Sequence, residues 1–336
     1  MNLDPSIFLS LALLFGIAAH FRAMDGYSFL RRLMSSLERR LGALYAVVLV
    51  AGLFSPFVLN DVVVLVLTPV LARYAKQFRV DVAPLLVAEV SFVNIASSLT
   101  PFGNPQNLLL WVGSGISAGQ FVLGTWQPLL ISGALTAAAL YFFRRGEGGA
   151  REFSAPIGAR SPPLYLIAVG AVIFSMDAVG APSAVALGVA FLLGFGFTFR
   201  NLRQFAKEFD YRSLLILWLL IGSIAVADAL LDPALAPYVA QAASGTQPYS
   251  ALFVGLTSNI ISNVPATQLM LGTVGVSRQA APRIAVEAGL AGNITPVGSF
   301  ANILALVLVR RAGLPVKKAI LLQLAVGLVS FLPAFL

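Results

Sequence analysis

Long apolar segments separated by short charged segments make up most of this chain. A helix that crosses a membrane needs roughly 20 predominantly apolar residues, and several segments reach or approach that length. A transmembrane barrel would instead show stretches of ~10 residues with alternating polarity, and these segments do not alternate. The pattern therefore predicts an all-α polytopic membrane protein. The segments that predict simple crossings are residues 5–21, 121–143, 164–177, 183–199, 214–231 and 319–336.

Four further apolar segments are interrupted by proline, glycine or asparagine. The first of them, residues 42–72, has basic clusters on both sides. Because basic segments stay in the cytoplasm, both ends are expected there, and the segment is predicted to be a re-entrant hairpin. Each arm should hold about a dozen residues, or about 18 Å of helix, with Asn60 and Asp61 at the tip. A polar tip at membrane depth is tolerated only where it is buried in protein or lines a cavity.

Two motifs occur twice, in the same order. Ser-x-x-x-x-Asn begins at Ser55 and at Ser258, and Thr-Pro-x-Gly-x-x-x-Asn begins at Thr100 and at Thr295. The charge pattern places the first hairpin on the cytoplasmic side and the second on the outer side, which predicts inverted-topology repeats, a common plan of secondary transporters. The predicted division is a first repeat over 1–143 (hairpin about 42–72, broken helix about 82–112), a cytoplasmic linker over 144–163, and two linking spans with a second repeat over 164–336 (hairpin about 249–275, broken helix about 285–309).

The Thr-Pro-x-Gly segments favour a binding site. Proline has no N–H and restricts the residue before it, and we expect Gly103 and Gly298 to supply the unusual dihedral angles of an unwound stretch. The break would free carbonyl oxygens for a hard cation and create a half-helix whose N-terminus favours an anion. The alternative is a plain proline kink, with asparagine hydrogen bonds between helices. Repetition of the motif in both halves favours the site.

Composition and charge narrow the class of protein. Of the 336 residues, 58% are hydrophobic and 11% are charged, against roughly 25% charged in an average soluble domain. The net charge of +8 lies in clusters, which indicates topology rather than nucleic-acid binding. Cysteine is absent and no Gly-rich phosphate loop is present. The one histidine, His20, is expected at the membrane interface, and no catalytic constellation indicates an enzyme.

With these motifs the chain resembles the ion transporter superfamily, which includes arsenite permeases, citrate permeases, divalent anion–sodium symporters and a sodium–proton antiporter branch. In the divalent-anion branch each hairpin tip carries Ser-Asn-Thr, which binds substrate and helps to form a sodium site. Here the tips contain Ser262-Asn263-Val264 and Leu59-Asn60-Asp61, and the second of these is closer to the arsenite-permease branch. The resemblance is carried by residues 59–69, Asn94 with 100–107, 262–267 and 292–299.

Motifs and resemblance together predict one central site. An acid inside the membrane is a functional hypothesis by default, and Asp61 is the best candidate because it lies at the tip of the predicted re-entrant hairpin. Glu89 and Glu287 are either functional or solvated near helix ends. The predicted site residues are Asn60, Asp61, Thr100, Gly103, Asn104, Asn107, Ser262, Asn263, Thr267, Asn293, Thr295, Gly298, Ser299 and Asn302, with sodium near Asn60, Asp61 and Thr100 and near Asn263 and Thr295.

The predicted function is secondary active transport of a small anion by alternating access, in a cell membrane of the bacterial inner-membrane type. Sodium or protons are the expected coupling ions, and no other cofactor is expected. A sodium–proton antiporter of the same superfamily is the main alternative, and an anion channel a weaker one, because a channel needs a continuous pore. The expected partners are the lipid bilayer and the solute, not nucleic acid. A homodimer is compatible with the sequence.

Overall fold

Every regular element that the structure describes is helical. The computed structural model describes residues 5–143, 161–229 and 236–336, and within them α-helices and three short 3₁₀ helices account for all regular structure. The predicted all-α class is therefore confirmed. Within these described residues, four helices are long and apolar enough to cross a membrane: Pro5–Ala23, Ala118–Tyr141, Ser183–Glu208 and Lys317–Phe335. The predicted crossings at 164–177 and 214–231 correspond to the helices Ser161–Ala178 and Tyr211–Ala229.

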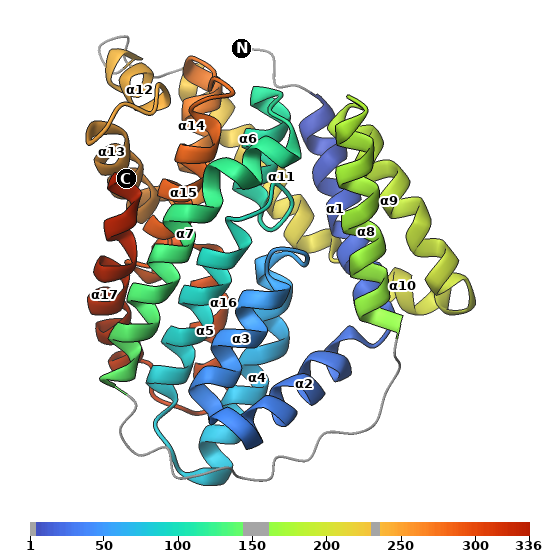
Figure 1. The fold of residues 1–336 in the computed structure, drawn as a ribbon, viewed down its shortest axis with the longest axis vertical. Helices are drawn as coiled ribbons and strands as arrows, with labels where there is room; N and C mark the ends of the chain where they lie inside the picture. Colours follow the sequence, from blue (N-terminus) through green and yellow to red (C-terminus); the bar gives the residue numbers. More distant parts are fainter. Residues whose placement is uncertain (1–4, 144–160, 230–235) are drawn as a thin grey trace.

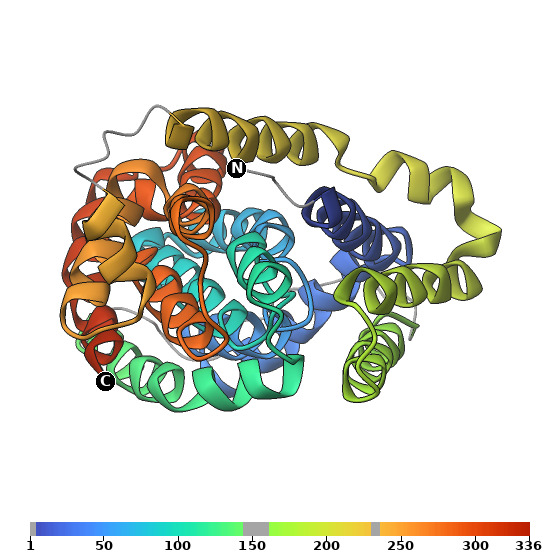
Figure 2. The ribbon, with the colours of Figure 1, turned by 90° about the horizontal axis from the view of Figure 1, so that it is seen from above.

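The helices form two groups. The group drawn at the right in Figure 1 contains α1 (Pro5–Ala23), α8 (Ser161–Ala178), α9 (Ser183–Thr198) and α10 (Leu202–Glu208). Seen from above, α10 and α11 (Tyr211–Ala229) run along one edge of the molecule and join this group to the rest (Figure 2). The larger group contains α3 (Ala43–Phe54), α4 (Asn60–Phe78), α5 (Val82–Ser97), α6 (Pro105–Ser114), α7 (Ala118–Tyr141), α13 (Tyr249–Ile261), α14 (Asn263–Thr273), α15 (Ala281–Ala291), α16 (Phe300–Arg311) and α17 (Lys317–Phe331).

Two helical hairpins lie in the larger group. Helices α3 and α4 meet at a short turn that ends at Leu59, and α13 and α14 meet at the single residue Ser262. Ser262 has φ 74°, a left-handed conformation that is uncommon for a residue with a side chain. In Figure 1 the first hairpin rises from the lower end of the molecule, and the second lies in the upper half. Whether the two halves are inverted across a membrane stays a prediction.

The second arm of the first hairpin is longer than expected. Helix α4 has 19 residues rather than about a dozen, because Arg73 and Lys76 continue the helix instead of ending it. At 1.5 Å per residue the arm is about 28 Å long. It therefore reaches well beyond the apolar stretch that the sequence pattern marked.

Each hairpin is followed by an interrupted helix and then by a continuous one. The first break separates α5 from α6, and α7 follows. The second break separates α15 from α16 and contains the 3₁₀ turn η2 (Pro296–Gly298), and α17 follows. The same order of elements thus occurs twice in the described chain. Most of the predicted linker, residues 144–160, lies outside the described residues.

Helices α2 (Gly26–Leu41) and α12 (Ala236–Ala243) lie outside the apolar segments that the sequence pattern marked. Helix α2 buries Leu30, Met34 and Glu38 on one face, the i, i+4, i+8 spacing of an amphipathic helix. Its many arginines hid that spacing, which made the segment look like a loop. Helix α12 has only eight residues, too few for a clear periodicity.

His20 is buried and does not lie at an interface. The side chain has no exposed surface, and its Nδ1 lies 2.8 Å from Oγ1 of Thr198. Phe191, Phe195 and Phe205 surround the ring, with centroids 4.3–5.3 Å away. The interfacial prediction is therefore wrong: His20 helps to join α1 to α9 and α10.

Candidate functional site

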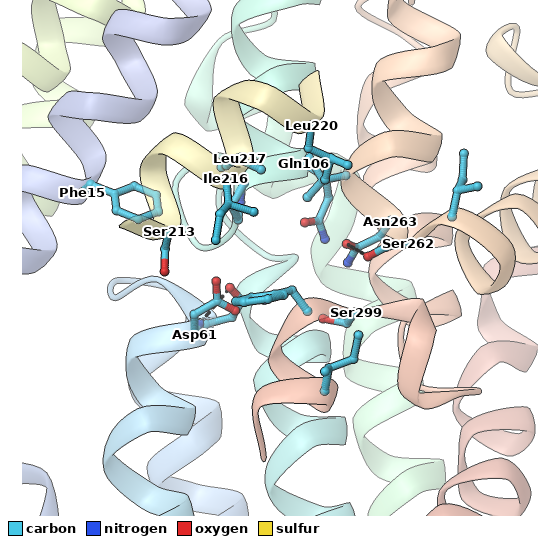
Figure 3. Close-up of a pocket in the computed structure, with 16 residues that line it drawn as sticks. Phe15, Asp61, Gln106, Ser213, Ile216, Leu217, Leu220, Ser262, Asn263 and Ser299 are labelled. Carbon is cyan, nitrogen blue, oxygen red and sulfur yellow. Dashed lines mark hydrogen bonds between the residues drawn. The ribbon is translucent and has the colours of Figure 1, made fainter. Parts of the chain in front are cut away.

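A pocket of about 240 Å³ lies where the two hairpin tips meet (Figure 3). The first hairpin contributes Asn60 and Asp61, and the second contributes Ser262 and Asn263. These residues are about 200 positions apart in the chain, so only the fold brings them together. The complete lining is Phe15, Asn60, Asp61, Pro105, Gln106, Ser213, Ile216, Leu217, Leu220, Ile261, Ser262, Asn263, Val264, Ser299, Phe300 and Ile303.

Four helices begin at the wall of this pocket. Helices α4, α6, α14 and α16 start at Asn60, Pro105, Asn263 and Phe300, and all four residues line the pocket. The first N–H groups of a helix have no partner within the helix, and the helix dipole places partial positive charge there. Helix N-termini are therefore ready-made sites for anions. The lining contains no Lys, Arg or His, and Asp61 is its one carboxylate.

Each hairpin is tied to the helix break of its own half. In the first half the Asn60 N–H donates to the carbonyl oxygen of Gly103 (3.0 Å), and the Thr100 hydroxyl donates to that of Pro56 (2.5 Å). In the second half the Thr295 hydroxyl donates to Oδ1 of Asn259 (2.7 Å). These bonds hold each tip against its break, so that the helix N-termini converge.

Two asparagine side chains form hydrogen bonds with the backbone of the two helix breaks, outside the pocket lining. Nδ2 of Asn107 donates to the carbonyl oxygens of Thr100 (2.8 Å) and Ser97 (3.2 Å). Nδ2 of Asn302 donates to the carbonyl oxygens of Thr295 (3.1 Å) and Gly292 (2.5 Å). Some of the carbonyls that the breaks free are therefore satisfied within the protein. Asn107 and Asn302 thus have the structural role that the sequence analysis gave as the alternative to a binding site, in which asparagine side chains hydrogen-bond to the backbone and join helical segments.

A buried amide network links the halves behind the pocket. Nδ2 of Asn94 donates to Oδ1 of Asn293 (3.1 Å) and of Asn302 (3.0 Å). Oδ1 of Asn94 accepts from the hydroxyl of Ser299 (3.0 Å), which lines the pocket. Nδ2 of Asn293 continues the network to the hydroxyl of Ser330 on α17 (2.7 Å). The network therefore connects the pocket wall to both broken helices.

The predicted site residues fall into two sets. Asn60, Asp61, Ser262, Asn263 and Ser299 line the pocket. Asn104 does not line it but caps α6, because its Oδ1 accepts from the Asn107 N–H (2.9 Å). The other predicted residues that do not line the pocket are Thr100, Gly103, Asn107, Thr267, Asn293, Thr295, Gly298 and Asn302.

Sequence reasoning missed one wall of the pocket. Helix α11 contributes Ser213, Ile216, Leu217 and Leu220, spaced at i, i+3, i+4 and i+7. That spacing marks one face of a helix, but it does not say what the face contacts. Nothing in the sequence marks Phe15 on α1 as a site residue. Gln106 lies inside the repeated motif, but it was not among the predicted site residues.

The two motif glycines serve close packing rather than unusual dihedral angles. Neither Gly103 nor Gly298 is among the described glycines with positive φ, so that interpretation is wrong. A Cβ on Gly103 would clash with the carbonyl oxygen of Ser97, and one on Gly298 would lie 3.0 Å from that of Ala291. The absence of a side chain lets each break fold back onto the helix before it.

The other two acids inside the apolar segments lie outside the pocket. Glu89 and Glu287 have no exposed surface, so the alternative of a solvated helix end is wrong. Oε1 of Glu89 accepts from the hydroxyl of Thr68 (2.9 Å). Glu287 accepts from Nε2 of Gln247 (2.6 Å) and the hydroxyl of Ser250 (2.5 Å). Both carboxyl groups pack an interrupted helix against a neighbouring element.

Any metal bound here would need oxygen ligands. Among the described residues, no group of three or more His, Cys, Asp or Glu side chains is placed to hold a metal ion. Amides, hydroxyls and the Asp61 carboxylate are the polar side chains of the pocket. Such hard oxygen donors suit sodium better than a transition metal.

Comparisons with known proteins identify relatives along most of the chain. The family model described as "Citrate transporter" matches residues 5–288. "Inner membrane protein YbiR" of Escherichia coli K12 is 30% identical over 281 residues, which cover 80% of this chain and 69% of that protein. "Silicon efflux transporter LSI3" of Oryza sativa subsp. japonica is 34% identical over 106 residues, 31% of this chain and 22% of that protein.

A solved structure shares the fold. The crystal structure of the Alcanivorax borkumensis YdaH transporter, described as having an unusual topology, aligns with a TM-score of 0.50 and 17% sequence identity. The alignment covers 98% of this chain and 83% of that one. At this identity the similarity concerns the arrangement of helices alone.

Proposed function

We propose that the pocket between the hairpin tips is the solute site of a secondary active transporter, because this chain belongs to the citrate transporter family of membrane transporters. The membership confirms the resemblance to the ion transporter superfamily and makes the chain an integral membrane transporter. The family is one of permeases, not enzymes. A bacterial inner membrane is the proposed location, as for the relative described as an inner membrane protein.

The proposed solute is a small anion. The observation that carries this proposal is the convergence of four helix N-termini on one pocket of about 240 Å³. Helix N-termini attract negative charge without a basic side chain, and none lines the pocket. The two tips come from different halves of the chain, so a relative movement of the halves would open and close the site, as alternating access requires.

Coupling to a cation follows from the membrane potential. Moving an anion into a negative-inside cell costs about 2.3 kcal/mol per charge per 100 mV. Uptake therefore needs a co-transported cation, whereas efflux does not. Asp61 places a carboxylate beside the helix N-termini, where a sodium ion would neutralise it. We propose sodium as the coupling ion, with the proton as the alternative.

A sodium–proton antiporter is the second candidate, and one observation favours it. The pocket contains a carboxylate and no basic side chain, which is also what a cation site requires. An antiporter would exchange sodium for protons through Asp61 and carry no anion. The two functions differ in the solute moved.

Uptake into proteoliposomes separates these functions. The panel should contain citrate, because the family is described as citrate transporters, silicate, because one relative is named a silicon efflux transporter, and arsenite. Each solute is tested with a sodium gradient, with a proton gradient and with neither. Sodium-driven accumulation of citrate, which is anionic at neutral pH, supports the proposal. Accumulation of silicate or arsenite alone would contradict an anionic solute, because both are mostly uncharged acids at neutral pH. Sodium-driven proton flux, with no accumulation of any solute, would replace it with the antiporter.

A further inference from the structure

A groove lined by positive charge lies at the end of α4 that is far from the pocket. Two hollows of about 360 and 650 Å³ flank this part of the helix, and both are lined by Pro69 and Arg73. The first lies between α4 and α2, and the second between α4 and α16. We call the two together the basic groove. Its lining is Tyr27, Arg31, Leu65, Val66, Pro69, Val70, Ala72, Arg73, Lys76, Gln77, Leu308, Arg311 and Ala312.

The cations of the basic groove are not neutralised by the described protein. Its lining contains Arg31, Arg73, Lys76 and Arg311 and no acid. None of the four forms a salt bridge with a described residue. Arg31 donates from Nη2 to the hydroxyl of Ser28 (2.9 Å), but its Nε is buried with no hydrogen-bond partner among the described residues. The groove therefore attracts an anion from outside the protein.

The cations of the basic groove lie about as far from the solute pocket as lipid phosphates lie from the middle of a bilayer. Arg73 follows Asp61 by 12 residues on α4, and Arg311, at the end of α16, lies 12 residues after Ser299, which precedes that helix. Twelve residues of helix span about 18 Å, and half of the hydrocarbon core of a bilayer is about 15 Å thick. If the pocket lies near the middle of the membrane, both arginines reach the headgroup layer.

The apolar lining lies at the depth of the acyl chains. Leu65, Val66, Pro69 and Val70 come before Arg73 on α4, and Leu308 comes before Arg311 on α16. Going from the pocket toward the basic end, apolar side chains thus come first and cations follow. A phospholipid has the same order, with acyl chains toward the centre of the membrane and phosphate at the surface.

We propose that the basic groove binds an anionic phospholipid. Basic hollows between membrane helices are suited to anionic lipid headgroups. Arg73, which both hollows share, would hold the phosphate together with Lys76 and Arg311 on one side and Arg31 on the other. A zwitterionic lipid is disfavoured, because its ammonium group would find no acid in the lining. Two hollows around one arginine also predict that cardiolipin, with two phosphates, binds more tightly than phosphatidylglycerol.

The test measures lipid binding directly and needs no transport assay. The purified, delipidated protein in detergent is titrated with phosphatidylglycerol, cardiolipin or phosphatidylcholine, and bound lipid is counted by native mass spectrometry. We expect binding of both anionic lipids, tighter for cardiolipin, and little binding of phosphatidylcholine. Because each cation near the membrane surface contributes about 1 kcal/mol, or about fivefold in affinity, Arg311→Gln and Arg73→Gln should each weaken binding about fivefold.

Arg310 provides a matched control. It is an exposed arginine next to Arg311 that does not line the basic groove, so Arg310→Gln should bind anionic lipid like the wild type. Equal binding of phosphatidylcholine would overturn the proposal, and so would equal losses in Arg310→Gln and Arg311→Gln. Displacement of the lipid by inorganic phosphate at the same concentration would also overturn it, since the groove would then be an entrance for soluble anions.

Discussion

Asn107 and Asn302 make the same pair of hydrogen bonds in the two halves of the chain. Each amide donates to backbone carbonyl oxygens that lie seven and ten residues before it. The correspondence extends the repeated Thr-Pro-x-Gly-x-x-x-Asn pattern from sequence to geometry. It also shows what the final asparagine does: it connects the two ends of an interrupted helix.

Replacing either asparagine should destabilise the protein. In Asn107→Ala and Asn302→Ala, two carbonyl oxygens lose their donor, and a buried unsatisfied group costs about 1–3 kcal/mol. Asn302→Ala should cost more, because Oδ1 of Asn302 also accepts from Asn94, whereas Oδ1 of Asn107 has no partner among the described residues. Thermal unfolding in detergent measures the effect. Melting temperatures equal to the wild type in both variants would contradict this role.

Asparagines at the hairpin tips should behave in the opposite way. Asn60 and Asn263 line the pocket, and among the described residues their amide nitrogens donate to no backbone carbonyl oxygen. Asn60→Ala and Asn263→Ala should therefore lower solute uptake in proteoliposomes about tenfold or more, roughly the loss of one hydrogen bond to a charged group. Their melting temperatures should fall less than those of Asn107→Ala and Asn302→Ala, because Asn60 loses only the bond from the Asp61 N–H (2.9 Å) and Asn263 only a longer one from the Ser262 hydroxyl (3.4 Å). Normal uptake in both would remove these amides from the site.

A single methyl group at Gly103 should disrupt the first break. A Cβ there meets the carbonyl oxygen of Ser97, and a clash with backbone cannot be relieved by a change of rotamer. We expect Gly103→Ala to destabilise the protein by about 1–3 kcal/mol, as overpacking does. Gly52→Ala is the matched control: it lies inside α3 with open space around its Cβ and should be neutral or slightly stabilising. Equal melting curves for both variants would refute the packing role.

The helical elements follow largely from local properties of the sequence. Apolar stretches of membrane length and breaks at Thr100-Pro101 and Thr295-Pro296 are visible without any tertiary information. Helix α2 was missed because its many arginines hide the helical spacing of its buried positions, among them Leu30, Met34 and Glu38. The length of α4 was missed because a helix inside a protein can carry basic residues past the apolar stretch.

The sequence motifs located the candidate site, but they did not show which of its side chains face the pocket. Repetition identified Asn60, Asn107, Asn263 and Asn302 together, yet the first and third line the pocket and the other two lie behind it. Motif spacing cannot separate these roles, since the direction depends on which segment packs against each break. The wall formed by α11 was hidden for the same reason.

The predicted topology can be tested by cysteine labelling, because the chain has no native cysteine. Lys76 and Gln120 are exposed on α4 and α7. From the charge clusters, Lys76→Cys should react with an impermeant maleimide only from the cytoplasmic side, and Gln120→Cys only from the outer side. Gly115 is less suitable than Gln120, because its φ of 65° would strain a cysteine. Labelling of both from the same side would exclude the re-entrant hairpin.

Asp61→Asn should reveal the coupling ion. Asp61 is the one carboxylate of the pocket, and a unit charge about 4 Å from a cation contributes about 4 kcal/mol at an effective dielectric constant of 20. If sodium binds beside it, the neutral amide should lower the apparent sodium affinity at least about tenfold, while the pH profile of uptake is kept. If Asp61 instead carries a proton, the substitution should abolish the pH dependence and leave the response to sodium unchanged.

Asp81→Asn is the control for the loss of one negative charge. Asp81 caps α5 and pairs with Lys318, away from the pocket, so its substitution should leave both dependences as in the wild type. We expect the sodium outcome for Asp61→Asn, because the amides and hydroxyls of the hairpin tips offer oxygen ligands that a sodium ion needs and a proton does not. Uptake that keeps wild-type dependence on sodium and on pH in Asp61→Asn would exclude this carboxylate from coupling. The coupling cation would then have to bind at neutral oxygens alone.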